Sequence, residues 1–360
     1  MSVYVIAEAG VNHNGSEELA FQLVDIAVNS GADAVKFQTF RANKIVNKHA
    51  LKANYQLAST DINESQYEML KRLELSYDSH RKLKDYCDSK GIDFLSTAFD
   101  EDSLNFLHKE LKLKTLKIPS GEITNAPLVL SHALTKSNLI VSTGMATIQD
   151  IKNVLGVIAY GYIHSIPARH LSQESFKEAF LSEEGQNILR QKVTILHCTS
   201  EYPAPLDQVN LKAMNSINKE FNLPIGYSDH TEGINISIAA VAMGATIIEK
   251  HFTLDKSMPG PDHLSSSDPV ELTNMISAIR EVERSLGSPV KEPSSSEILN
   301  LEAIRKSLVA ETGIKKGDIF SDKNMSIKRP AKGLSPFRYW DIIGKKAYRD
   351  FEEGDSIEEQ

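Results

Sequence analysis

Two histidines in the second half of the chain have the type and spacing of a shared metal site. His230 and His251 each follow a short run of β-forming residues, and an apolar helical segment, Ile234 to Met243, separates the two runs. This order is typical of a β-α-β unit, whose parallel strands lie about 4.8 Å apart. Imidazoles at neighbouring strand ends can reach one divalent cation at about 2.1 Å each. We predict a site for Mn²⁺ or Mg²⁺ that could polarise an aldehyde, with two unrelated histidines as the alternative.

Lysine and serine side chains recur at the ends of other strand-like runs. Lys36 sits between apolar residues within such a run, where a lysine that only faced solvent would be costly, and Lys117 precedes Ile-Pro-Ser-Gly-Glu. Together with Ser120, Ser142 and Ser228 they could form a cradle for a phosphate and a carboxylate. We expect a buried lysine pair of this kind to need a multiply charged anion. The alternative is that the lysines are solvated surface residues.

Two carboxylates are predicted at the same strand ends. Glu8 closes the run Tyr-Val-Ile-Ala-Glu, and Glu122 closes Ile-Pro-Ser-Gly-Glu. One could act as a general base while the other binds sugar hydroxyls. The alternative is that each pairs with Lys36 or Lys117 for structure alone. No Gly-x-Ser-x-Gly nucleophile elbow is present, and Asn12 to Gly15 reads as a turn, so His13 receives no catalytic role.

Short apolar runs, each followed by a polar loop and a helical pattern, must position these side chains. Eight such β-α units in about 290 residues favour a (β/α)₈ barrel, an α/β fold, over an open doubly wound sheet. No Gly-x-Gly-x-x-Gly follows any run. Side chains alternate faces along a strand, so Lys36 and Gln38 should point into the barrel while Val35 and Phe37 point outward. The predicted strands are 3–7, 34–38, 93–97, 115–118, 139–142, 193–198, 224–228 and 246–250.

Composition changes divide the chain into a large and a small domain. The catalytic barrel is predicted over residues 1–286, with a polar insertion at 163–191 that holds helices at 173–181 and 184–191. Residues 287–303, which contain Pro289, Pro293 and three consecutive serines, are predicted to be a linker. Residues 304–360 should form a small β-rich domain that ends in a solvated acidic tail from Asp350.

The overall charge and cysteine content exclude several classes of protein. A net charge of -8 without a block of Lys or Arg argues against nucleic acid or a membrane surface as the partner. Cys87 and Cys198 are the only cysteines, too few for a disulfide framework, which suits a reducing cytosol. No signal peptide is visible, and the most apolar run, 236–248, is shorter than the roughly 20 residues of a membrane span. We expect a cytoplasmic protein.

These motifs together resemble the sialic acid synthase family, which condenses phosphoenolpyruvate (PEP) with N-acetylmannosamine or related amino sugars. The resemblance covers nearly the whole chain, and residues 304–360 resemble the antifreeze-protein-like SAF domain that follows the barrel in these enzymes. The motifs that carry it are Ala-Glu-Ala-Gly-Val-Asn-His-Asn-Gly at 7–15, Lys-Phe-Gln-Thr at 36–39, Lys-Ile-Pro-Ser-Gly-Glu at 117–122, Ser-Thr-Gly-Met at 142–145, Ser-Asp-His at 228–230 and Pro-Gly-Pro-Asp at 259–262.

The resemblance implies a role for each candidate residue. His230 and His251 would bind the catalytic metal, Mn²⁺ in the first place with Mg²⁺ or Co²⁺ as alternatives, and Glu8 would lie near the reacting atoms. Arg329, donated by the second domain of a partner subunit, would contact the sugar's N-acetyl group, which implies a domain-swapped homodimer. PEP would be held by Lys36, Thr97, Lys117, Ser120, Ser142, Ser200 and Ser228, and the sugar by Gln38, Glu122, Tyr202 and Asp262.

The implied reaction joins C3 of PEP to the open-chain sugar aldehyde and releases phosphate by C–O cleavage. N-acetylneuraminate synthesis from N-acetylmannosamine is the first interpretation. The alternatives are N,N'-diacetyllegionaminate synthesis from 2,4-diacetamido-2,4,6-trideoxymannose and, from another class, a non-catalytic carbohydrate-binding protein. Ser200, where some members have asparagine, and Ala331, where glycine is common, depart from the family pattern.

Overall fold

The chain folds into two compact units. A computed structural model describes residues 2–53, 56–57, 60–164 and 171–358. The first unit is Met1–Gly287 and the second is Ser288–Gln360. Each unit has a hydrophobic core of its own.

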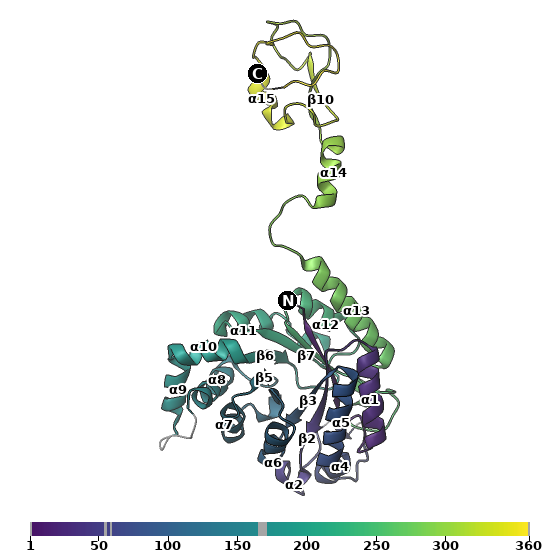
Figure 1. Ribbon diagram of the computed structural model, residues 1–360, viewed down its shortest axis with the longest axis vertical. Helices are drawn as coiled ribbons and strands as arrows, with labels where there is room; N and C mark the ends of the chain where they lie inside the picture. The colour runs from purple at the N-terminus through teal and green to yellow at the C-terminus, as the bar shows by residue number, and fades with distance from the viewer. Residues whose placement is uncertain (1, 54–55, 58–59, 165–170, 359–360) are drawn as a thin grey trace. The chain divides into compact units, whose positions relative to one another are not determined.

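Eight parallel strands form a closed barrel in the first unit, hydrogen-bonded in sequence order (Figure 1). This confirms the predicted (β/α)₈ fold, and each strand begins within one residue of its predicted start. The strands are β1 (Tyr4–Gly10), β2 (Ala34–Thr39), β3 (Asp93–Ala98), β4 (Thr115–Ile118), β5 (Asn138–Ser142), β6 (Val193–Cys198), β7 (Ile225–Asp229) and β8 (Ile247–His251).

Helices surround the strands on the outside of the barrel, as Figure 1 shows. Many begin at a Ser, Thr or Asp whose side chain accepts a hydrogen bond from the first turn, as Thr147 and Asp268 do. The helices are α1 (Glu17–Asn29), α2 (Ala42–Ile45), α4 (Gln66–Leu73), α5 (Tyr77–Lys90), α6 (Glu101–Asn105), α7 (Ala126–Leu134), α8 (Ile148–Ile163), α9 (Gln173–Leu181), α10 (Glu183–Lys192), α11 (Ala213–Phe221), α12 (Asn235–Ala242) and α13 (Pro269–Leu286).

The alternation of side chains along the strands separates two packing layers. Outward residues such as Val35 and Phe37 join the main core between the barrel and its helices. Inward residues near the strand starts, among them Ile6, Leu95 and Leu196, form a separate apolar cluster that fills the lower barrel. The next inward positions toward the strand ends are therefore the first that can present polar groups to a cavity.

Only glycine fits at position 226 on the inward face of β7. A Cβ there would lie 2.5 Å from the carbonyl oxygen of Ile247 on β8 and 2.5 Å from Cδ2 of Leu196 on β6. The absence of a side chain lets β7 pair closely with β8. The strand that ends just before His230 and the strand that ends at His251 are therefore held at normal sheet spacing.

The polar insertion adds two helices to the outside of the barrel. α9 has the predicted bounds, and α10 extends the predicted helix by one residue at each end. Both helices pack against α8. Residues 165–170 of the predicted insertion lie outside the described residues.

The second unit holds an antiparallel pair of strands, β9 (Ser307–Ala310) and β10 (Met325–Lys328), with short helices α14 (Ser295–Ile304) and α15 (Tyr339–Ile342). Helix α14 corrects part of the predicted linker. All of its residues except Ile304 fall in the second half of 287–303, and Ser294 and Glu297 form a capping box that starts the helix.

The predicted solvated tail is wrong. Phe351 and Ile357 are 2% and 1% exposed and belong to the core of the second unit. Phe351 also exchanges backbone hydrogen bonds with Ile314. Glu352 and Glu353, which lie between these two buried side chains, are exposed. The acidic composition of the segment therefore indicated a solvated tail and concealed its two buried apolar residues. Among the described residues, no helix is long and apolar enough to cross a membrane.

Candidate active site

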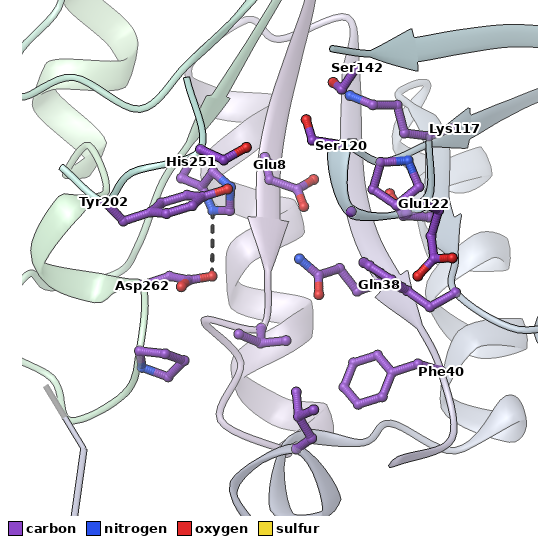
Figure 2. A pocket seen from close by; sticks show the side chains of 18 of the residues that line it. Glu8, Gln38, Phe40, Lys117, Ser120, Glu122, Ser142, Tyr202, His251 and Asp262 are labelled. Atoms are coloured by element: carbon purple, nitrogen blue, oxygen red, sulfur yellow. Dashed lines mark ion pairs between the residues drawn. The ribbon is translucent and has the colours of Figure 1, made fainter. Parts of the chain in front are cut away.

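A cavity of about 340 Å³ opens at the carboxyl ends of the barrel strands, where (β/α)₈ enzymes place their active sites (Figure 2). Every barrel residue that the sequence singled out for chemistry lines it. Arg329 belongs to the second unit, directly after β10, so its role stays a prediction. The lining residues named from sequence are Glu8, Lys36, Gln38, Thr97, Lys117, Ser120, Glu122, Ser142, Ser200, Tyr202, Ser228, His230, His251 and Asp262.

Two lysines and two glutamates form a buried charge cluster at the floor of this cavity: Glu8, Lys36, Lys117 and Glu249. Each is at most 5% exposed. Lys36 Nζ lies 2.7 Å from Glu8 Oε2 and 3.6 Å from Glu249 Oε2. Lys117 Nζ donates to both carboxylate oxygens of Glu249 at 2.8 Å. The protein itself supplies two carboxylates that compensate part of the charge of the lysines, and the anion site at the lysine pair stays a prediction.

Glu249 is a site residue to which the sequence analysis assigned no role. It accepts a hydrogen bond of 2.8 Å from Ser228 Oγ in addition to those from Lys117. Its place two residues before His251 put it on the same inward face of β8, and that signal was visible in the sequence. What the sequence does not show is that β4 and β8 face each other across the barrel, which brings Lys117 to it.

The two carboxyl groups of the cluster have opposite proton affinities. Burial raises the pKa of Glu8 to about 7, since the opposing effect of Lys36 is incomplete and Glu249 adds repulsion. Burial alone would also raise the pKa of Glu249, but Lys117 and Lys36 outweigh it and hold that pKa well below its usual range. Glu249 is therefore a permanent anion, whereas Glu8 can gain or lose a proton near neutral pH.

Serine hydroxyls converge beside Lys117. Ser120 Oγ accepts a hydrogen bond of 2.9 Å from the Gly144 backbone N–H. A Cβ at residue 144 would lie 2.1 Å from Ser200 Oγ and 2.8 Å from Ser120 Oγ. Glycine in the Ser-Thr-Gly-Met motif is therefore required for the two hydroxyls to approach this loop. Hydroxyls and an ammonium group arranged in this way can bind an oxyanion.

His230 and His251 face each other with ring centroids 5.4 Å apart. His230 Nδ1 lies 2.7 Å from the carbonyl oxygen of Thr199, so Nδ1 must carry a proton. Burial opposes the charged form, but Cys198 and this carbonyl outweigh it and raise the pKa of His230, so a cation at Nε2 would have to displace a proton. Burial, with His230 and Lys36 nearby, lowers the pKa of His251 well below its usual range. The His251 ring is therefore neutral at pH 7 and can act as a ligand, and His230 can do so once its Nε2 proton is displaced.

The donor set fits a loosely held divalent cation. His251 Nδ1 is buried without a hydrogen-bond partner among the described residues and lies 3.8 Å from Asp262 Oδ2. Figure 2 marks this contact between His251 and Asp262 with a dashed line at one side of the cavity, next to Tyr202. Across residues 2–53, 56–57, 60–164 and 171–358, no three His, Cys, Asp or Glu side chains converge as a complete metal site. A metal would therefore take two imidazoles from the protein and its remaining ligands from water or substrate.

The Asn12–Gly15 turn holds the loop that carries Asp262. Asn12 donates to the carbonyl oxygen of Phe252 at 2.8 Å and to Ser266 Oγ at 2.9 Å. Asn14 donates to the carbonyl oxygen of Pro259 at 2.9 Å. His13 is buried, and burial lowers its pKa to about 3, so it does not act as an acid or base near neutral pH. These positioning contacts were not predicted from the sequence.

One side of the cavity is apolar, which the sequence analysis also missed. We call this surface the apolar wall. It comes from the ends of β1, β2 and β3 and from α2 and α4, and Figure 2 shows Phe40 beside Gln38 on this side. The apolar wall consists of Val11, Phe40, Ile45, Met69, Leu70, Leu73 and Phe99, which form a cluster separate from the main core.

Comparison with known proteins identifies the two parts of the chain. The NeuB family matches residues 23–291, and the SAF domain matches residues 305–359. An N,N'-diacetyllegionaminic acid synthase of Campylobacter jejuni is 47% identical over 99% of this chain and 98% of its own length. A Legionella pneumophila protein of the same name is 44% identical over 99% and 94%. The crystal structure of an N-acetylneuraminic acid synthetase from Leptospira borgpetersenii is 30% identical, with a TM-score of 0.67 over 84% of this chain and 91% of that one.

The raised pKa of Glu8 predicts a pH profile. If the ionised carboxylate serves the reaction, kcat/KM for PEP should rise as the pH rises through about 7 and level off above it. Lys36, Lys117 and Glu249 face this carboxyl group and set its pKa. In Glu8→Gln the part of the rise that is due to Glu8 should disappear, and the rate at pH 8 should fall by about 10²- to 10⁴-fold.

The matched control is Glu122→Gln, the same substitution at a half-buried carboxylate of the same cavity. It should keep the rise near pH 7. Ionisation of PEP itself affects all three proteins equally, so it cancels in the comparison. A Glu8→Gln enzyme that retained the wild-type rise would contradict the assignment.

Proposed function

We propose that this chain, which belongs to the NeuB family of PEP-condensing nonulosonic acid synthases and carries a SAF domain, makes N,N'-diacetyllegionaminate. The acceptor would be 2,4-diacetamido-2,4,6-trideoxymannose. Relatives named for this product are 47% and 44% identical along almost the full chain, against 30% for a neuraminic acid synthetase. We therefore favour this product over N-acetylneuraminate, the first interpretation of the sequence.

PEP is the substrate that the buried charge cluster fits best. Its phosphate and carboxylate can share Lys36 and Lys117, while Ser120, Ser142 and Ser200 offer hydroxyls on the same side. Glu249 fixes the position of Lys117 before PEP arrives, since both of its oxygens are engaged. Preorganised cations in a site that excludes water bind an anion more strongly than solvated lysines do.

The proposed condensation changes bonds in a defined order. C3 of PEP attacks the aldehyde carbon, the carbonyl oxygen takes up a proton, and positive charge develops at C2. Water adds to C2 and loses a proton. The bond between C2 and the phosphate oxygen then breaks, which expels phosphate, and the remaining C2 hydroxyl loses its proton to become the carbonyl of the product. Glu8 lies beside Lys36 in this layer and can stabilise the positive charge or accept the proton of water.

His230 and His251 would hold the divalent cation, Mn²⁺ in the first place, which would polarise the aldehyde carbonyl when bound. Asp262 and Tyr202 lie on the same side of the cavity, where they can orient the sugar hydroxyls and the amide at C2. Gln38 and Glu122 offer further hydrogen bonds at the rim.

A homodimer would complete the site with Arg329 of the second unit. Two aromatic side chains on that unit, Phe337 and Trp340, are 93% and 79% exposed. Exposed aromatic residues of this size favour burial against another protein surface. We propose that a second copy of this chain provides that surface. Arg329 would then reach the acetamido group of the sugar bound to the second copy.

The acceptor assay tests the proposed product. Phosphate release from PEP with Mn²⁺ should show kcat/KM at least about tenfold higher for the diacetamido sugar than for N-acetylmannosamine. A preference for N-acetylmannosamine would return the chain to N-acetylneuraminate synthesis. Release with neither sugar would remove both proposals.

Metal removal supplies the control for this assay. A chelator should abolish phosphate release, and added Mn²⁺ should restore it. His230→Ala should lose turnover and metal binding together, because one of two protein ligands is gone. Full activity of His230→Ala without added metal would contradict the ligand assignment.

If Arg329 of one copy contacts the sugar bound to the other copy, Arg329→Ala should change the kinetics in a specific way. The KM for the sugar should rise at least about tenfold while the KM for PEP stays unchanged, because a charge-assisted hydrogen bond to the sugar is lost. Sedimentation should give the mass of a dimer, and the emission of Trp340, the only tryptophan, should shift on dilution. Equal changes in both KM values, or a monomer at assay concentration, would argue against the dimer.

A further inference from the structure

The active-site cavity has two sides of different chemistry. One side carries the buried charge cluster, the serine hydroxyls and the two histidines. The opposite surface is the apolar wall, which begins where Gln38 gives way to Phe40 at the end of β2 (Figure 2). A substrate that spans the cavity must therefore place its charged, reacting end among the lysines and its other end against hydrocarbon.

Part of the apolar wall is left open toward the cavity. Val11 and Phe40 are at most 5% exposed, whereas Ile45, Leu70 and Phe99 are only partly buried. Packing among themselves does not cover these three side chains. A bound group that buried them would gain free energy in proportion to the apolar area removed from water.

We propose that the apolar wall selects the acceptor by contacting the C6 methyl group and the C4 acetamido methyl group of a 6-deoxy, 4-acetamido sugar. This inference rests on the proposed function and deepens it. N-acetylmannosamine carries hydroxyls at both of those positions. Hydroxyls placed against Ile45, Leu70 and Phe99 would lose water without gaining hydrogen-bond partners from these side chains.

The geometry of the reaction directs the sugar toward this wall. C1 of the open-chain sugar must lie at the carbon that PEP attacks, near the charge cluster and the histidines. C6 is the carbon farthest from C1 along the chain, and C4 lies between them. Both distinguishing substituents therefore lie toward the far end of the sugar, where the lining consists of the apolar wall with the amides of Gln56 and Gln66 beside it.

Two substitutions at partly buried positions test the proposal without threatening the core. Ile45→Thr keeps the β-branch but replaces the ethyl group with a hydroxyl, and Leu70→Gln places an amide at a partly buried position of α4 that lines the cavity. Each should lower kcat/KM for the diacetamido sugar about tenfold or more, since the methyl contacts are lost. kcat/KM for N-acetylmannosamine should stay the same or rise, and the KM for PEP should not change.

A third sugar separates the two contacts. N-acetyl-6-deoxymannosamine has the C6 methyl group but keeps the C4 hydroxyl. The wild-type enzyme should use it better than N-acetylmannosamine and less well than the diacetamido sugar. Ile62→Thr is the matched control for Ile45→Thr, because Ile62 is 76% exposed and does not line the cavity. It should leave all three rates unchanged.

The outcomes separate this inference from the proposed function. If the wild-type enzyme prefers the diacetamido sugar and both variants lose that preference selectively, the apolar wall determines specificity. If it prefers the diacetamido sugar but both variants lower all acceptors equally or keep the wild-type ratio, the inference is overturned while the proposed function stands. A wild-type preference for N-acetylmannosamine overturns both. Circular dichroism of each variant confirms that the fold is intact.

Discussion

The burial of two ammonium and two carboxylate groups in one layer of the barrel is the constraint on which the site depends. Charges removed from water are stable only when geometry and hydrogen bonding compensate for lost hydration. Lys36, Lys117, Glu8 and Glu249 come from four strands, so the barrel must close in one register for the ion pairs to form. A shift of one residue on any of these strands would turn its charged group outward.

This constraint links folding to chemistry. The apolar layer beneath the cluster excludes water from below, and Ser228 satisfies Glu249 from β7. The lysines are therefore held in place before any substrate binds, and Glu8 is left with a pKa about 7 that its neighbours do not fully lower. A site with fixed cations and one carboxyl that titrates near neutral pH suits a reaction in which a multiply charged anion is bound and protons are transferred.

The sequence predicted what local pattern controls and missed what long-range packing controls. Alternation within β2 was enough to orient Lys36, because it depends on neighbouring residues alone. The pairing of Lys117 with Glu249 joins residues 132 positions apart and depends on how the barrel closes. The apolar wall escaped notice for the same reason, since separate segments supply Val11, Phe40 and Leu70. In the tail, acidic composition concealed Phe351, which the second unit buries.

Calorimetric titration of PEP into the protein without acceptor tests the central claim most directly. The account predicts that Lys117→Gln weakens PEP binding at least about tenfold, because a buried cation that contacts the anion is lost. The matched control Lys109→Gln, at an exposed position outside the cavity, should bind PEP like the wild type. A folded Lys117→Gln variant that bound PEP with unchanged affinity would contradict the assignment of the buried charge cluster to PEP.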